Sequence, residues 1–206
     1  MKTHSIFRAT AWKILEKFGS KGIQFVIQII LARILLPDDY GIVAILTVFI
    51  SLSNVFIQNG FSTSLIQKKE TTQADFCTAL FTSMGIAVLL YITLFVASPF
   101  IASFYEMEDL AVYLRVQSLL LFAGSFNSVQ YAYISRKLNF RAYTIATLIA
   151  SFISGAAGIF FAMNGFGVWS LIFQQLIANY LAVAILYMLV EWRVQLIFSI
   201  ESLKTL

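Results

Sequence analysis

Apolar residues run along this chain in six long stretches. They lie near 14–36, 41–60, 77–98, 110–134, 143–163 and 168–190. A helix needs about 20 residues to cross roughly 30 Å of hydrocarbon, and each stretch is close to that length. The strands of a membrane barrel alternate apolar and polar residues, whereas these stretches stay apolar for many residues in succession. The pattern predicts an all-α integral membrane protein built as a bundle of six transmembrane helices.

The composition agrees with a membrane protein and excludes a soluble domain. Hydrophobic residues make up 60% and charged residues only 12% of the chain, where a soluble domain carries about 25% charged residues. A single cysteine, Cys77, and a single histidine, His4, provide neither an internal disulfide nor a metal-binding cluster. The chain also lacks nucleotide-binding and hydrolase motifs, so we expect no cofactor, no metal and no enzymatic activity.

The basic residues predict the orientation in the membrane. Twelve of the 14 lysines and arginines fall at the N-terminus, in the second and fourth loops, or after the sixth stretch. Arg33 and Arg115 alone fall on the other side, together with the acidic loop 106–109. Because basic loops stay in the cytoplasm, both termini are expected there. The net charge of +4 then reflects topology and does not point to nucleic acid.

A polar stripe on the first predicted span carries the main candidate site. Lys17, Lys21, Gln24 and Gln28 share one helical face, and Arg33 lies slightly off it. Charged residues within a span normally face a bundle interior or a water-filled cavity, so the stripe predicts one wall of a cationic cavity for a phosphate or pyrophosphate. Alternatively, the charged residues reach the headgroups at the two ends and leave only the glutamines inside.

Uncharged polar residues on other spans are secondary candidates. Asparagines and glutamines in a lumen could hydrogen-bond sugars, or they could connect helices. They are Asn54, Gln58, Asn127, Gln175 and Asn179. Ser151 with Gly155 and Ser154 with Gly158 predict a close-packing face. All ten carboxylates lie at or beyond the predicted helix ends, which argues against a proton or sodium relay inside the chain.

Five segments, in order, resemble bacterial Wzx-like lipid-linked oligosaccharide flippases of the multidrug/oligosaccharidyl-lipid/polysaccharide exporter superfamily. The segments are 31–41, 60–69, 114–118, 136–141 and 165–169. The resemblance implies export of undecaprenyl-pyrophosphate-linked oligosaccharide units across the inner membrane during surface polysaccharide synthesis. Family members have about twelve or more spans in two lobes. Residues 1–190 would therefore be the N-terminal lobe, and 191–206 the cytoplasmic linker toward a C-terminal lobe.

Two other functions are consistent with the same sequence. One is a lobe of a cation-coupled multidrug antiporter, in which the polar lumen would bind organic cations. The other is a membrane scaffold that holds polymerase and transferase partners of the polysaccharide pathway without moving substrate. The basic stripe and the absence of a carboxylate within the spans disfavour the antiporter.

Overall fold

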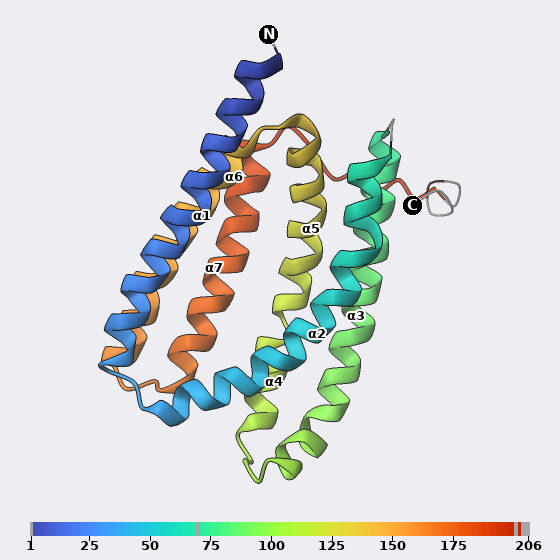
Figure 1. Ribbon diagram of the computed structural model, residues 1–206. Helices are drawn as coiled ribbons and strands as arrows, with labels where there is room; N and C mark the ends of the chain where they lie inside the picture. Colours follow the sequence, from blue (N-terminus) through green and yellow to red (C-terminus); the bar gives the residue numbers. More distant parts are fainter. Residues whose placement is uncertain (1, 69–70, 200–201, 203–206) are drawn as a thin grey trace.

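The computed structural model describes residues 2–68, 71–199 and 202, with side chains described at 12, 18–57, 64–66, 68, 71–199 and 202. This part of the chain forms helices and contains no strand (Figure 1). The helices are α1 (Lys2–Ala32), α2 (Pro37–Gln67), α3 (Gln73–Phe104), α4 (Leu110–Gln117), α5 (Leu120–Lys137), α6 (Phe140–Met163) and α7 (Val168–Leu189). The prediction of an all-helical membrane bundle is confirmed.

Five of the six predicted spans correspond to helices long and apolar enough to cross a membrane. These are Pro37–Ile57, Gln73–Phe104, Leu110–Lys137, Phe140–Met163 and Val168–Leu189. The described apolar part of α1, Phe18–Ala32, is shorter. The 31 residues of α1 rise about 46 Å, more than the hydrocarbon thickness. A membrane crossing by α1 stays a prediction.

Two predicted spans differ in detail from the helices. The first was expected to reach residue 36, but α1 ends at Ala32, because Leu36 is extended before Pro37, the first residue of α2. The fourth is divided at Ser118 and Leu119 by a 3₁₀ turn, in which the Phe122 amide donates to the Leu119 carbonyl at 3.2 Å. The Tyr180 hydroxyl of α7 donates to the same carbonyl at 2.8 Å.

The helices form two groups that meet along α5 and α7. In one group α6 packs against α1 and α7, and in the other α5 packs against α2 and α3 (Figure 1). Helix α2 crosses the bundle diagonally from the end of α1 to lie beside α3. The start of α1, the end of α5 and the end of α7 lie at the same end of the bundle. We call this the basic end, because Lys68, Arg136, Lys137, Arg141 and Arg193 lie there.

The small-residue face of α6 is a close-packing surface, as predicted. Ser151, Ser154, Gly155 and Gly158 are all buried. Gly155 faces Ile27 of α1, and Gly158 faces Gln174 of α7, whose Cγ lies 3.0 Å from the position of an added Cβ. Helix α6 therefore approaches both neighbours at glycines, where no side chain separates the helices.

Pro99 lies inside α3, where it removes one helical hydrogen bond, and a neighbouring side chain replaces the missing donor. Proline has no N–H, so the Phe95 carbonyl loses its helical donor. The Ser98 hydroxyl donates to that carbonyl at 2.8 Å and accepts from Arg115 Nε of α4 at 2.8 Å. The Arg115 guanidinium also lies over the Phe95 ring, 4.3 Å from its centroid. Arg115 therefore connects α4 to the turn of α3 that contains Pro99.

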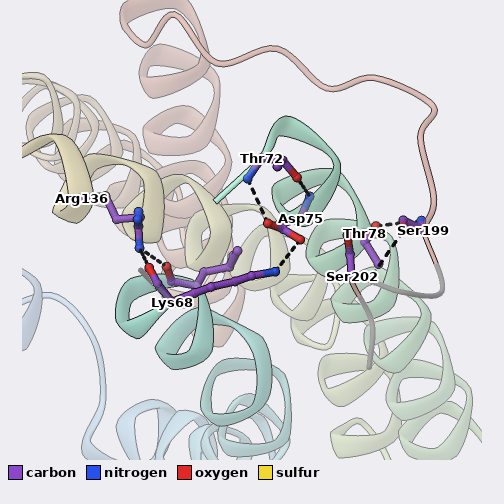
Figure 2. Close-up of polar contacts among 8 residues, drawn as sticks. Lys68, Thr72, Asp75, Thr78, Arg136, Ser199 and Ser202 are labelled. Atoms are coloured by element: carbon purple, nitrogen blue, oxygen red, sulfur yellow. Dashed lines mark hydrogen bonds and ion pairs between the residues drawn. The ribbon is translucent and has the colours of Figure 1, made fainter. Parts of the chain in front are cut away.

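A polar cluster connects the end of α2 with the start of α3 at the basic end. Asp75 accepts from Lys68 Nζ and from the Thr72 amide, both at 2.9 Å (Figure 2). Arg136 of α5 donates from Nη1 to the carbonyls of Leu65, at 2.9 Å, and of Lys68. The last carbonyls of a helix lack internal donors and carry partial negative charge. A guanidinium at this position supplies both hydrogen-bond donors and a compensating positive charge.

The segment after α7 lies against the start of α3. Trp192 is buried, and its ring centroid lies 6.4 Å from that of Phe76. The Ser199 amide donates to Thr78 Oγ1 at 3.1 Å (Figure 2). Residues 191–199, the first part of the predicted linker 191–206, thus lie across the basic end of the bundle.

Candidate functional site

A polar cleft of about 320 Å³ lies among α1, α5, α6 and α7. Its lining residues are Ser20, Lys21, Gln24, Asn127, Tyr143, Thr147, Ala150, Ser151, Ala178, Asn179 and Ala182. The three alanines, one on α6 and two on α7, provide the space, and the longer polar side chains provide hydrogen-bonding groups. The cleft brings together four residues predicted from the sequence, which are Lys21, Gln24, Asn127 and Asn179.

Lys21 gives the cleft its charge. It is exposed on α1, three residues before Gln24, and both side chains reach the same cleft. No described carboxylate lines the cleft, and none lies within ion-pair distance of Lys21. An ammonium that no described carboxylate neutralises favours an anionic group, and phosphate oxygens are suitable acceptors for it.

The other helices contribute neutral groups. The Asn127 amide has no hydrogen-bond partner among the described residues. Asn179 donates through Nδ2 to the Gln175 carbonyl at 2.9 Å, and its Oδ1 makes no bond within the described part of the chain. Amides and hydroxyls can both donate and accept, which suits the hydroxyl groups of a sugar.

Two predicted residues of the stripe lie away from the cleft. Gln28 is exposed one turn further along α1 and does not line it. Arg33 is exposed in the turn after α1, so it does not continue the helical stripe. It follows Lys21 by twelve residues, which corresponds to about 18 Å along a helix axis. The side chains of Lys17 and Gln58 lie outside the described residues.

Two other secondary candidates take part in contacts between helices. Gln117 of α4 donates from Nε2 to Gln175 Oε1 of α7 at 3.1 Å. Asn54 of α2 packs against Gly124 of α5, with its Oδ1 only 2.8 Å from the position of an added Cβ. The Asn54 Oδ1 is buried without a donor among the described residues. Gln175 and Asn54 thus belong to the packing of the bundle, the alternative considered for these amides.

The cleft also contains residues that the sequence analysis did not select. Tyr143 and Thr147 lie on α6 and Ser20 on α1. Tyr143, Thr147 and Ser151 are spaced by four residues and therefore share a helical face, a signal that was present in the sequence. Ser20 immediately precedes Lys21 and gives no comparable signal.

Comparison with known families assigns the chain to one of them. The family model described as polysaccharide biosynthesis protein matches residues 30–206, which is most of the chain. The chain belongs to the polysaccharide biosynthesis protein family. The resemblance inferred from the five ordered segments is confirmed, and the chain is a multi-pass helical membrane protein of this family.

The chain is also similar to named proteins from three bacteria. The chain is 26% identical to the succinoglycan biosynthesis transport protein ExoT of Rhizobium meliloti, over 98% of this chain and 41% of the relative. It is 25% identical to the lipopolysaccharide biosynthesis protein WzxC of Escherichia coli, over 52% and 22%. It is 29% identical to the teichuronic acid biosynthesis protein TuaB of Bacillus subtilis, over 41% and 17%.

The chain spans less than half the length of these relatives, 41% in the case of ExoT. No solved structure matches it. None of the three relatives is named as an enzyme.

Proposed function

We propose that this chain is the N-terminal lobe of an exporter that moves undecaprenyl-pyrophosphate-linked oligosaccharide units across the bacterial inner membrane. The observation that carries the proposal is the cationic cleft, in which Lys21 lies beside the amides of Gln24, Asn127 and Asn179. The match to a succinoglycan transport protein over 98% of this chain supports it. The chain acts by binding and reorientation, without catalysis.

The chemistry of the cleft fits both parts of such a substrate head. The Lys21 ammonium attracts the pyrophosphate, and the neutral amides and hydroxyls bond the sugar hydroxyls. Lipid-linked sugars are made on the cytoplasmic side. The cleft is lined by Tyr143 and Thr147 from the first two turns of α6, the helix that begins at the basic end. With that end in the cytoplasm, the cleft is reached from the side on which the substrate is made.

The second lobe is the partner that makes transport possible. Exporters built of two lobes bind substrate near the membrane centre and alternate between openings to either side. Linker 191–206 leads toward that lobe, and the pathway's polymerase and transferase are further partners. The absence of a carboxylate from the described cleft lining disfavours the multidrug antiporter, which needs an anionic site for cations.

Complementation in cells tests the proposal. The gene that encodes this chain, read to its natural stop codon, is expressed in a strain that lacks its polysaccharide exporter. We expect surface polymer to return with the wild-type gene and with Arg33→Ala, but not with Lys21→Ala at equal protein level. Lipid-linked units should accumulate on the cytoplasmic side in the Lys21→Ala strain. Equal surface polymer in the two variants would contradict the proposal.

A further inference from the structure

A second hollow, apolar and separate from the cleft, runs between α5 and α7. Its volume is about 520 Å³. Phe122 and Phe126 of α5 form one wall, and Tyr187 of α7 belongs to the other. Ala123 and Ala184 leave the space between them, because their side chains are single methyl groups. We call this hollow the α5–α7 groove.

The groove extends to the basic end of the bundle. Helices α5 and α7 run in the same direction, since one helix, α6, lies between them in the chain. On α7 the lining continues from Tyr180 to Tyr187, a rise of about 10 Å. Val194, which follows the end of α7, also lines it. The groove therefore opens at the membrane surface where the lysines and arginines gather.

Arg193 lies at this opening and forms no ion pair with a described carboxylate. Its guanidinium lies 5.0 Å from the centroid of the Tyr187 ring, itself a wall of the groove. Nη1 donates to the carbonyls of Tyr187, at 2.8 Å, and Val190, at 2.6 Å. Glu191, two residues before Arg193, pairs instead with Lys137 at 3.3 Å.

We propose that the α5–α7 groove binds one hydrocarbon chain of an anionic membrane phospholipid, whose phosphate lies on Arg193. A hydrocarbon chain has no polar group, so it can fill the apolar α5–α7 groove within the membrane without losing any hydrogen bond. An arginine held by carbonyls through one nitrogen still offers other N–H groups to phosphate oxygens. The site lies at the leaflet that is rich in basic residues, where anionic headgroups are attracted.

The proposal does not depend on transport, because lipid retention is measured without it. The purified full-length protein is exchanged into mixed micelles with equal amounts of phosphatidylglycerol and phosphatidylethanolamine. Native mass spectrometry then counts the lipids that stay bound. We expect one phosphatidylglycerol per protein, preferred over phosphatidylethanolamine by about fivefold, the scale of one basic residue at a membrane surface.

Three variants identify the site. Ala184→Phe fills the groove and should abolish retention, whereas the same substitution at Ala156, exposed on α6, should leave it unchanged. Arg193→Gln should remove the preference for phosphatidylglycerol, and Arg193→Lys should restore part of it. Equal retention of the two lipids by the wild type, or equal retention in the Ala184→Phe and Ala156→Phe proteins, would overturn the proposal. A dimer that Ala184→Phe abolishes would overturn it too, since a second copy would then occupy the groove.

Discussion

Ile27 of α1 lies directly over Gly155 of α6, so a methyl group added to Gly155 would fall 2.0 Å from Ile27 Cδ1. Neither residue lines the cleft, but the contact lies about one helical turn from residues that do. The cleft residues Lys21 and Gln24 come just before Ile27 on α1, and Ser151 comes one turn before Gly155 on α6. The close approach of the two helices thus holds the α1 and α6 residues of the cleft next to one another.

Gly155→Ala should destabilise the bundle, because the new methyl group forces Ile27 to move within a packed interface. Overpacking of this kind costs about 1–3 kcal/mol. Unfolding by denaturant in detergent micelles measures the change in the free energy of unfolding. Ile27→Ala in the same protein should recover part of the loss, since it removes the clashing atoms.

Gly85→Ala is the matched control. Gly85 also lies within a helix, but an added Cβ there has no neighbour within 4 Å. Alanine is the better helix former by about 1 kcal/mol, so this variant should be at least as stable as the wild type. Similar stability of the Gly155→Ala and Gly85→Ala proteins would show that α1 and α6 do not pack as described.

Ser98→Ala should weaken the turn at Pro99. The substitution removes the donor to the Phe95 carbonyl and the acceptor of Arg115 Nε at once. Buried groups left without partners cost about 1–3 kcal/mol. Thermal unfolding compares this variant with Ser103→Ala, an exposed serine on the same helix that should tolerate the change. Equal melting temperatures would mean that Ser98 does not hold this turn.

Arg136→Met should loosen the end of α2 while keeping an apolar side chain of similar length. The guanidinium satisfies carbonyls of Leu65, Ile66 and Lys68, and hydrogen bonds to charged groups contribute about 1.5–3 kcal/mol. Hydrogen exchange should accelerate in the last turn of α2. Arg141→Met is the control, because Arg141 packs over the Trp12 ring at 5.9 Å and lies at the start of α6. Unchanged exchange in the Arg136→Met protein would argue against this role.

The sequence predicts the helices well, because whole apolar stretches leave few alternatives in a membrane. Helical spacing also placed Lys21 and Gln24 on one face. Helical spacing could not separate Lys21 and Gln24 from Gln28, since the rest of the cleft lining comes from α5, α6 and α7, which meet α1 only in the fold. The pairing of Gln175 with Gln117 and the turn at Ser118 likewise depend on packing between distant helices.

Orientation is tested by cysteine labelling in a Cys77→Ser background. The acidic loop that contains Glu108 is expected in the periplasm, and Lys137 at the basic end in the cytoplasm. In cells with a permeabilised outer membrane, an impermeant maleimide should label Glu108→Cys. It should reach Lys137→Cys only after the inner membrane is opened. The reverse pattern would overturn the orientation and, with it, the proposed entry of substrate from the basic end.

A leaflet-exchange assay tests the central claim, that the cleft at Lys21 carries the head of a lipid-linked oligosaccharide. Purified full-length protein is reconstituted into vesicles that contain a fluorescent undecaprenyl-pyrophosphate-linked sugar, and an impermeant quencher reports how much label reaches the outer leaflet. Loss of a charge-assisted contact of about 1.5–3 kcal/mol corresponds to a rate about ten- to a hundredfold lower. We expect that decrease for Lys21→Ala, with Arg33→Ala equal to the wild type. Equal rates for Lys21→Ala and the wild type would contradict the account.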